Sequence, residues 1–417
     1  MRDRGKMIEK ERKMMSRKNR RSFLKTAGAA MAMTQIPLLP EAYAQGNRPR
    51  LRITDVRNVS LRMAEEIGSL DPAWSLGSRW TVRIGGGSFM EIHTDQGLVG
   101  ISNAVSEKYL PIIKEYLVGK DPFDAELHFT NLKTITESTR GFPAVDIALW
   151  DLIGKACNQP LYKLWGGGKD RIVPYASMVI VGTPEERADM ATQLLAEGWK
   201  AIKLRFHAPT FEEDIRQAEA VRKAVGDKMA IMVDANQDHR VRMGIEWDLD
   251  RALKTARALE PLDFFFLEDA LNRSDLEGNA ELTRQSNVPI AGAENNRTFE
   301  EYRENLRRDV YDFYNPEVNT LGVYGYRKVD AMVHIFDKRI VPHNGAMTFG
   351  LVAHMHLVAA SGVTPYVEVL HDPPIGSYLH HFAIFSNHPT VDKDGLITMP
   401  QTPGLGIEMN PDLVEKG

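Results

Sequence analysis

The sequence predicts an α/β fold built on a (β/α)8-type, TIM-like barrel. From residue 172 onward, short apolar runs alternate with segments of helical periodicity, which is typical of βα units and a parallel sheet. There are eight such runs, and eight parallel strands at this spacing close most naturally into a barrel. The 417 residues, 43% hydrophobic and 26% charged, are enough for a full core and exclude a disordered chain.

The expected strands are short and apolar. They cover 173–180, 199–206, 230–236, 264–269, 289–295, 310–316, 339–344 and 366–370. The segments between them carry helix signals: 184–197 begins with Thr183, a proline and two glutamates, and 212–225 ends at Gly226. Similar patterns fill 249–259, 274–286, 298–308, 322–337 and 348–361. In such a barrel the functional residues lie at the carboxyl ends of the strands.

The first 44 residues are expected to be an export signal rather than part of the fold. A basic segment at 2–25 is followed by an apolar run at 26–39, which is shorter than the roughly 20 residues that span a bilayer. Residues 42–44 are Ala-Tyr-Ala, a cleavage pattern, and residues 19–25 (NRRSFLK) match the twin-arginine export motif. The sequence therefore predicts export to the periplasm by the twin-arginine machinery, with no membrane segment in the mature protein.

Charge and cysteine content exclude several classes of protein. The chain has 52 basic and 56 acidic side chains, and its net charge of -4 does not indicate a nucleic-acid partner. Loss of residues 1–44 would take away 11 basic and four acidic side chains and leave an acidic mature protein. The single cysteine, Cys157, excludes an internal disulfide and a cysteine-ligated zinc site.

Three carboxylates interrupt otherwise apolar strands. Asp234, Glu268 and Glu294 end the third, fourth and fifth expected strands, where an unpaired charge is costly. Three such groups facing one barrel mouth favour a metal site over three separately satisfied acids. Oxygen ligands without a cysteine or histidine cluster indicate Mg²⁺ as the cofactor, with Mn²⁺ as the alternative. Asn236, two residues past Asp234, is expected to contact a metal-bound water or the substrate.

Cationic and titratable residues accompany the carboxylates on the same rim. Lys203 and Arg205 end the second strand, Glu317 follows the sixth, His343 ends the seventh and Glu368 lies in the eighth. A metal and a lysine can hold a small-molecule carboxylate substrate and stabilise the enediolate formed when a base removes its α-proton. His343 is the expected base, with Glu317 orienting its imidazole.

Two further histidines, His354 and His356, lie two positions apart on the last expected helix. Side chains at this spacing point to different sides of a helix. We therefore do not expect these two residues to share a ligand.

Taken together, these residues resemble the enolase superfamily, in its mandelate racemase and muconate lactonizing enzyme branch. Residues 139–167 resemble the helix that leads from the family's capping domain into its barrel, and 394–413 resemble the segment that returns to the cap. The resemblance implies an α+β capping domain before the barrel, completed by the C-terminal segment, and a homo-oligomer. With the export signal at 1–44, the implied parts are the cap at 45–168, the barrel at 169–385 and the C-terminal segment at 386–417.

The resemblance also implies a role for each residue on the rim. Asp234, Glu268 and Glu294 are similar to the three metal ligands of the family. Lys203 and Arg205 fall on its K-x-K motif, and Glu317 with His343 falls on its Asp-His dyad. Glu368 falls on an acid that donates a hydrogen bond to the enediolate in such enzymes. Cap loops near 62–80 and 103–109 are implied to close over the substrate, with Trp74, Arg79 and Trp80 as candidate contacts.

Two residues depart from the family pattern. The second lysine of the K-x-K motif, an acid/base in racemases of this branch, is Arg205 here, and an arginine with a pKa above about 12 is a poor base. The aspartate of the dyad is Glu317, which has a longer side chain. Racemisation by two bases needs groups on opposite faces of the substrate, and the sequence offers only His343. A one-base reaction is therefore favoured.

The leading hypothesis is a lyase that dehydrates a sugar acid to a 2-keto-3-deoxy acid by β-elimination. A cycloisomerase, epimerase or racemase acting on a related acid or lactone is the alternative enzyme, with Lys203 as its base. A non-catalytic exported carbohydrate-binding protein is the alternative from another class, because fold alone does not imply function. The three carboxylates, Lys203 and His343 argue against it, since sugar binding alone requires none of them.

Overall fold

The computed structural model of the protein describes residues 50–136, 142–238, 246–345 and 347–415. Residues from Leu51 to the C-terminus belong to one unit. The export signal expected at residues 1–44 lies outside the described residues and stays a prediction. Among the described helices, none is both long enough and apolar enough to cross a membrane.

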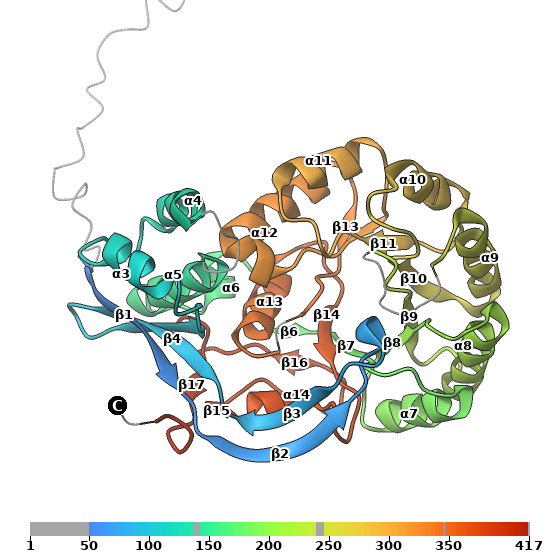
Figure 1. The fold of residues 1–417 in the computed structure, drawn as a ribbon, viewed down its shortest axis with the longest axis horizontal. Helices are drawn as coiled ribbons and strands as arrows, with labels where there is room; N and C mark the ends of the chain where they lie inside the picture. The colour runs from blue at the N-terminus through green and yellow to red at the C-terminus, as the bar shows by residue number, and fades with distance from the viewer. Residues whose placement is uncertain (1–49, 137–141, 239–245, 346, 416–417) are drawn as a thin grey trace, which may run out of the picture. The chain divides into compact units, whose positions relative to one another are not determined.

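Eight parallel strands form the central sheet, which curves into a barrel with helices on its outer side (Figure 1). The strands follow the order of the chain from β7 to β13, and β14 pairs with β7. They are β7 (Pro174–Ser177), β8 (Ala201–Arg205), β9 (Ala230–Asp234), β10 (Phe264–Glu268), β11 (Ile290–Gly292), β12 (Phe313–Tyr314), β13 (Arg339–Ile340) and β14 (Val367–Leu370). Each strand lies within the apolar run that predicted it, so the barrel is confirmed.

The barrel has one seam, between β13 and β14. Across the part of the chain that the structure describes, no backbone ladder joins these two strands. Instead, the backbone N–H of Asn344 donates to the Glu368 carboxylate of β14 at 2.9 Å. The side-chain amide of Asn344 donates to the Glu368 carbonyl oxygen at 3.4 Å. The seam is therefore held by residues that lie directly beside His343.

Helices α7 to α13 connect the strands, and the caps seen in the sequence begin several of them. At α7 (Pro184–Ala196), the Thr183 hydroxyl accepts the Glu186 N–H at 3.2 Å, and the Glu186 carboxylate accepts the Thr183 N–H at 2.9 Å. This arrangement satisfies amides that have no partner inside the helix. The same pattern begins α8 and α11. The helices are α8 (Phe211–Val225), α9 (Leu249–Leu259), α10 (Leu276–Gln285), α11 (Phe299–Arg307), α12 (Val318–Ile335) and α13 (Phe349–Ala360).

A separate α+β domain precedes the barrel, as the fold class predicted. Its antiparallel sheet has the order β1–β4–β5, and an apolar core joins this sheet to helices α3 to α5. The elements are β1 (Ile53–Ser60), β4 (Ser88–Thr94), β5 (Val99–Asn103), α3 (Leu110–Leu117), α4 (Ala125–Thr136) and α5 (Phe142–Ala156). We call this domain the cap.

Helix α5 joins the cap to the C-terminal segment through Asp151. The buried carboxylate accepts the backbone N–H of Ile101 in β5 at 3.0 Å and that of Leu405 at 2.8 Å. Lys155 donates to the same carboxylate at 2.6 Å. A buried charge needs such donors. The C-terminal segment also forms two small sheets, pairing β15 (Phe385–Asn387) with β17 (Glu408–Met409) and β16 (Ile397–Thr398) with β6 (Arg171–Ile172).

Helix α12 begins earlier than the sequence pattern predicted, at Val318 rather than at residue 322. Its first turn is capped by the Glu317 side chain, which accepts the Asn319 N–H at 2.9 Å. Gly322 has φ 69° and interrupts the helix, so the periodicity is visible only beyond it. Asp146 of α5, in the N-terminal domain, supplies the helix cap for the second part of α12. Its carboxylate accepts the Tyr324 N–H at 2.8 Å.

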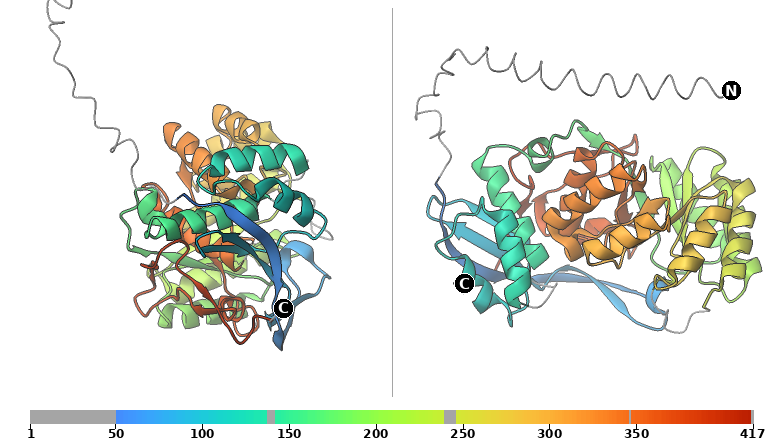
Figure 2. Two further views of the ribbon diagram at one scale, coloured as in Figure 1. Left: turned by 90° about the vertical axis from the view of Figure 1, so that its left-hand side faces the viewer. Right: turned by 90° about the horizontal axis from the view of Figure 1, so that it is seen from above.

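A long hairpin of β2 (Met63–Leu70) and β3 (Trp80–Gly85) runs from the cap to the barrel (Figure 2). Near its tip, the Ala73 N–H donates to the carbonyl oxygen of Val179, just past β7, at 2.8 Å. Also beside the tip, Trp80 stacks on His381 of α14 (Tyr378–Phe382) with ring centroids 5.7 Å apart. The hairpin therefore docks on the carboxyl ends of the barrel strands.

Candidate active site

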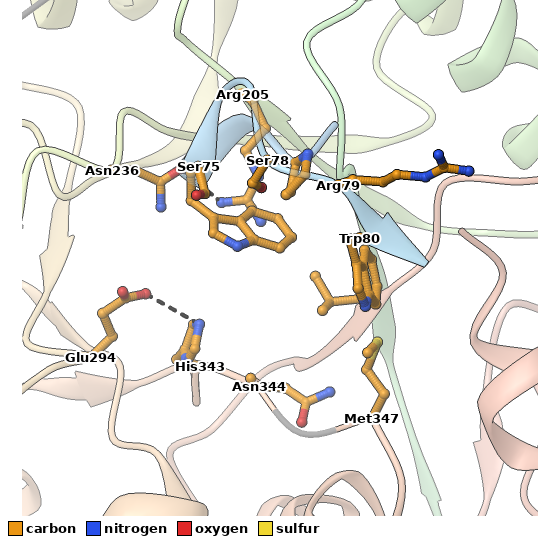
Figure 3. Close-up of a pocket in the computed structure, with 14 residues that line it drawn as sticks. Ser75, Ser78, Arg79, Trp80, Arg205, Asn236, Glu294, His343, Asn344 and Met347 are labelled. Carbon is orange, nitrogen blue, oxygen red and sulfur yellow. Dashed lines mark hydrogen bonds and ion pairs between the residues drawn. The ribbon is translucent and has the colours of Figure 1, made fainter. Parts of the chain in front are cut away.

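A cavity of about 520 Å³ lies between the β2–β3 hairpin and the barrel strands (Figure 3). This volume is typical of a small-molecule site. The hairpin side of its wall consists of Pro72, Trp74, Ser75, Ser78, Arg79 and Trp80. The barrel side consists of Arg205, Asn236, Glu294, His343, Asn344, Gly345, Met347 and Leu370.

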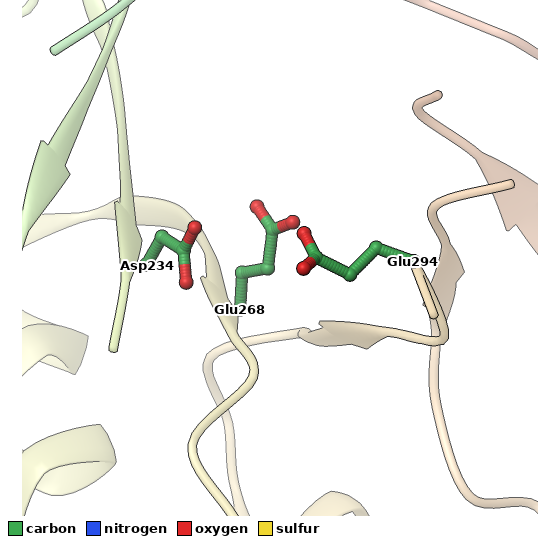
Figure 4. Close-up of side chains that lie close together, drawn as sticks. All are labelled: Asp234, Glu268 and Glu294. Atoms are coloured by element: carbon green, nitrogen blue, oxygen red, sulfur yellow. The ribbon is translucent and has the colours of Figure 1, made fainter. Parts of the chain in front are cut away.

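The three carboxylates expected to bind a metal converge beside this cavity (Figure 4). Asp234 and Glu268 are paired in register at the ends of β9 and β10. Glu294 follows β11 after Ala293, whose φ of 79° turns the chain. Each residue offers an oxygen within 4.8 Å of the other two, and all three side chains are buried. The structure thus brings together the three residues that the sequence singled out.

The electrostatics of this carboxylate cluster fit a divalent cation. Burial and the neighbouring Asp234 and Glu368 raise the pKa of Glu268 to about 8, against the lowering effect of Lys203. One oxygen of Glu268, Oε1, is buried and accepts no hydrogen bond. A cation bound by the cluster would satisfy this oxygen and offset the repulsion among the three charges.

A second acidic group shares Glu294 with Asp238 and Asp269. Burial, followed by the charges of Asp238 and Glu294, raises the pKa of Asp269 well above its usual range. Asn295 donates to Asp238 at 2.6 Å and to Glu294 at 2.9 Å. A cation at this second group would offset the same kind of repulsion. The cluster of Asp234, Glu268 and Glu294 is the group in contact with the cavity wall, because Arg205 and Asn236 line the cavity and both donate to Asp234.

Lys203 lies under the carboxylates and is not among the residues that line the cavity. Its ammonium is 2.7 Å from Glu268, 2.8 Å from Glu368 and 3.7 Å from Asp234, and the side chain is fully buried. Burial lowers the pKa of Lys203, but Glu268 and Glu368 outweigh it and raise this pKa well above the ordinary value. Lys203 is thus a charged, enclosed counter-ion, which is a poor candidate for a base.

Arg205 lines the cavity and is held by several partners. Its guanidinium donates to Asp234, to the Ser177 hydroxyl at 3.0 Å and to the Met178 carbonyl oxygen at 2.8 Å. It also lies 5.1 Å from the ring centroid of Trp74. Burial lowers the pKa of Arg205, but Asp234 outweighs it and raises this pKa above the ordinary value. The residue is therefore a fixed positive charge at the cavity wall.

His343 projects into the cavity from the loop after β13. Its Nδ1 lies 3.1 Å from a Glu317 oxygen and its Nε2 lies 3.3 Å from a Glu294 oxygen. Burial lowers the pKa of His343, but Glu294, Glu317 and Glu368 raise it overall to about 10. His343 therefore holds a proton while the charge of Glu294 is uncompensated. The structure confirms the close pairing of Glu317 and His343 that the sequence predicted.

Glu368, which the resemblance implied to donate a hydrogen bond to the enediolate, faces two donors in this structure. One of its oxygens lies 2.8 Å from Lys203, and the other accepts the Asn344 N–H at 2.9 Å. Burial raises the pKa of Glu368, but Lys203, His343 and Arg205 outweigh it and lower this pKa to about 2. In this arrangement Glu368 is an ionised acceptor, because a carboxylate that faces a charged lysine gains most by losing its proton.

The four expected substrate contacts all line the cavity, in different ways. Trp80 faces it from the hairpin (Figure 3), and Trp74 also lines it. Arg79 donates to Ser69 at 2.7 Å, and its guanidinium extends away from the centre of the cavity. Asn236 donates to Asp234 at 2.9 Å, which places it beside the carboxylate cluster. The expected loop at 103–109 contributes none of the described lining residues.

Several residues of the site escaped the sequence analysis. Ser75 and Ser78 lie in the tip of the hairpin, and Asn344 and Met347 lie in the loop after β13. Loop residues carry no periodic signal in the sequence. Of these four residues, only Asn344 could have been predicted, because it follows His343 directly. His354 contacts Glu317 at 3.0 Å, whereas His356 contacts the Leu405 carbonyl oxygen at 3.0 Å. The two histidines therefore point apart, as their spacing indicated.

Together, the parallel barrel, three convergent carboxylates and a histidine paired with a glutamate define a class of metal-dependent enzymes that act on small carboxylates. Comparison with known families assigns the chain more closely. Residues 186–413 match the family described as enolase C-terminal domain-like, and residues 72–166 match the mandelate racemase / muconate lactonizing enzyme N-terminal domain. The protein belongs to the mandelate racemase and muconate lactonizing enzyme branch of the enolase superfamily. It is an enzyme, a lyase or an isomerase, of a superfamily that binds Mg²⁺.

Its relatives include both lyases and isomerases. The chain is 33% identical to 3,6-anhydro-alpha-L-galactonate cycloisomerase of Streptomyces coelicolor, over 66% of this chain and 70% of the relative. It is 28% identical to arabinonate dehydratase of Saccharolobus solfataricus, over 78% of this chain and 89% of the relative. A solved structure of a racemase from Streptomyces coelicolor with bound magnesium superimposes with a TM-score of 0.71 at 26% identity, covering 87% of this chain and all of that chain. These likenesses imply a small-molecule carboxylate as substrate.

Proposed function

We propose that the protein dehydrates a sugar acid to a 2-keto-3-deoxy acid, with His343 as the single base. The observation that carries this proposal is the composition of the cavity wall. Among the described lining residues, only His343 and Glu294 can accept a proton, and Glu294 belongs to the carboxylate cluster. Arg205 stands where a racemase of this branch would have its lysine, and it stays protonated. One base is enough for elimination but not for a two-base racemisation.

The reaction needs one proton acceptor that later becomes a donor. When held by Asp234, Glu268 and Glu294, Mg²⁺ would supply the positive charge that polarises the substrate carboxylate. His343 Nε2 takes the α-proton while Glu317 keeps Nδ1 protonated and fixes the ring. The α C–H bond breaks, a C=C bond forms and the β C–O bond breaks. The imidazolium returns its proton to the departing hydroxyl as water, and the enol product tautomerises to the keto acid.

The cavity wall supports this chemistry on its other side. Arg205 provides a fixed positive charge for an anionic substrate, and Trp74 covers its guanidinium. Trp80 and the other hairpin residues cover one side of the cavity. Ser75 and Ser78 offer hydroxyls to a polyhydroxylated chain.

A cycloisomerase is the second candidate, because a cycloisomerase is 33% identical to the chain. It would use His343 in the same role on a related acid or lactone, with an internal leaving group in place of a free hydroxyl. Lys203 is disfavoured as its base, since the side chain is fully buried among three carboxylates.

Exchange of the α-proton in D₂O, followed by NMR across a library of sugar acids and lactones, tests the proposal. Turnover with Mg²⁺ should give a 2-keto-3-deoxy acid, stop with EDTA, and fall by about 100-fold or more in His343→Asn. A ring-opened or isomeric product with no loss of water would favour the cycloisomerase. Exchange that survives His343→Asn would refute His343 as the base.

We further propose that residues 1–44 direct export of the folded protein by the twin-arginine machinery to the periplasm. The basic segment, the apolar run and the cleavage pattern of the sequence support this proposal. Fractionation of cells that express the full chain should place the protein outside the cytoplasm. Replacing Arg20 and Arg21 with lysine should retain it inside, and unchanged export would refute the proposal.

A further inference from the structure

Glu317 receives more hydrogen bonds than its pairing with His343 requires. One carboxylate oxygen accepts His343 Nδ1 at 3.1 Å and the Gly345 N–H at 2.6 Å. The other accepts the Asn319 N–H at 2.9 Å, the Asn319 side-chain amide at 2.7 Å and His354 Nε2 at 3.0 Å. A glutamate has one more rotatable bond than an aspartate, so more contacts are needed to hold its carboxylate in one place.

His354 reaches Glu317 from helix α13, on the side away from the cavity. Its side chain is fully buried, and its Nδ1 has no hydrogen-bond partner. A buried polar atom without a hydrogen-bond partner costs free energy, unless another interaction of the same residue offsets that cost. The gain lies at Nε2, which bonds to the charged carboxylate of Glu317. A hydrocarbon side chain would fill the same space without that cost.

The orientation of the His354 ring follows from its surroundings. The Val318 N–H also lies 3.2 Å from Nε2, but one nitrogen cannot both accept that proton and donate to Glu317. If Nε2 accepted the Val318 N–H, its lone pair would also face the Glu317 carboxylate, and the ring proton would sit on Nδ1, which has no partner. Nε2 therefore carries the proton and donates it to Glu317.

Asn319 connects the same carboxylate oxygen to the cap. Its amide oxygen accepts the side-chain amide of Asn103, at the end of β5, at 3.1 Å. The Asn103 amide oxygen in turn accepts the Thr348 hydroxyl at 2.9 Å. The Asn319 amide has little room to turn, since a Cβ on Gly350 would lie 2.4 Å from its nitrogen. The cap therefore contributes to the placement of Glu317.

We propose that His354 is a positioning residue for the reaction, which fixes Glu317 so that Glu317 can orient His343, and that Asn319 and Asn103 complete this support from the cap. The inference rests on the proposed function in so far as His343 is the base. His354 touches neither the cavity nor the carboxylate cluster, and it acts only through Glu317. The contact network, rather than any single distance, carries the inference.

Two variants of His354 and one control test the proposal by steady-state kinetics. His354→Leu removes the donor and keeps the volume, whereas His354→Gln keeps a donor near the position of Nε2. We expect kcat to fall by about tenfold or more in His354→Leu with KM within about twofold. His354→Gln should recover most of this loss. His356→Leu is the matched control, because His356 is equally buried on the same helix but bonds to the Leu405 carbonyl oxygen; its kcat should stay near that of the wild type.

A second readout needs no substrate. In Mg²⁺-loaded protein labelled with ¹⁵N-histidine, the His343 Nδ1 proton bonded to Glu317 should give a downfield imidazole signal, which His343→Asn identifies by its loss. We expect His354→Leu to shift or broaden this signal, and His354→Gln and His356→Leu to preserve it. An unchanged signal and an unchanged kcat in His354→Leu would refute the proposal.

The two readouts separate this inference from the proposed function. If no acid or lactone is turned over but the His343 signal depends on His354, the proposed function fails and the positioning role stands. If His354→Leu does not fold, Asn103→Ser tests the same support from the half-buried cap end. It should shift the His343 signal and lower kcat more than KM, and no effect on either would overturn the proposal.

Discussion

Glu317 has a longer side chain than the aspartate of the family dyad, and its hydrogen bonds show how the chain accommodates it. Donors converge on both carboxylate oxygens, from His343 on one and from Asn319 and His354 on the other. Burial raises the pKa of Glu317, but the two histidines outweigh it and lower this pKa well below the usual range. The carboxylate is thus a permanent acceptor, which a base with a defined tautomer requires.

Replacing Glu317 with glutamine should therefore impair catalysis without removing much volume. An amide offers one acceptor oxygen and one NH₂ group. The donors that now bond to one of the two carboxylate oxygens would therefore face the NH₂ group, which cannot accept their protons. We expect kcat to fall by about 10- to 100-fold and KM to change little. Steady-state kinetics on the substrate found in the exchange screen measures this effect. An undiminished kcat would mean that His343 needs no orienting carboxylate.

Arg205 should not tolerate lysine, even though lysine is the family residue. A lysine can pair with Asp234 but cannot also bond Ser177 and Met178 and keep the planar contact with Trp74. We expect kcat/KM of Arg205→Lys to fall by roughly 5- to 30-fold, and α-proton exchange in D₂O reports the residual activity. A gain of epimerised product would show instead that a second base had been created.

At the scale of single residues, the sequence predicted those whose position is marked by a local signal. Asp234, Glu268 and Glu294 stand at the ends of apolar runs, and the order of the strands brings those ends together. The contact of His354 with Glu317 gave no such signal, because it joins a helix interior to a loop 37 residues away. The roles assigned to these residues stay predictions until the variants are measured.

Among the elements, helices with strong caps were predicted within about two residues, and α12 was not. The reason is Gly322, where the helix is interrupted and its second part takes a cap from Asp146 on α5. A cap that lies 178 residues away in the chain cannot be read from local sequence. The loops around the site likewise carried no usable pattern.

Asp146 should make the free energy of unfolding fall as pH rises, which is opposite to the usual effect of an ion-paired carboxylate. Burial raises its pKa to about 7 in the folded protein, well above the usual value for aspartate. Between about pH 4 and pH 7 the folded state therefore binds a proton that the unfolded chain releases, so stability should fall as pH rises. Asp146→Asn should flatten this part of the profile. Thermal unfolding from pH 4 to pH 8 measures both proteins, and identical slopes would contradict the assignment.

For the whole molecule, the sequence predicted the barrel but not how the cap is attached to it. The attachment depends on pairs far apart in the chain, such as Asp151 with Leu405 and Asn103 with Asn319. Such contacts leave no periodicity, whereas βα repeats do. The cap itself was implied by family resemblance rather than by pattern, and its α+β structure is confirmed.

Magnesium should stabilise the whole fold through the carboxylate cluster. A cation that binds only the folded state at 100 times its Kd adds about 2.7 kcal/mol to the free energy of unfolding. We expect the thermal midpoint to rise with Mg²⁺ and to fall back with EDTA. Glu268→Gln should lose this shift. Asp269→Asn is the matched control and should keep it, because Asp269 belongs to the neighbouring acidic group and not to this cluster; loss of the shift there would place the cation in the neighbouring acidic group.

The seam of the barrel is the place where the sheet should open locally at the lowest free-energy cost. Among the described residues, strand β13 has a backbone ladder on one side only, to β12, and its other side is held to β14 by Asn344 and Glu368. Separating β13 from the sheet therefore breaks one ladder, whereas separating any central strand breaks two. Local opening costs least where few backbone hydrogen bonds are lost. His343, the proposed base, lies in the loop directly after this strand and would move with little loss to the rest of the barrel.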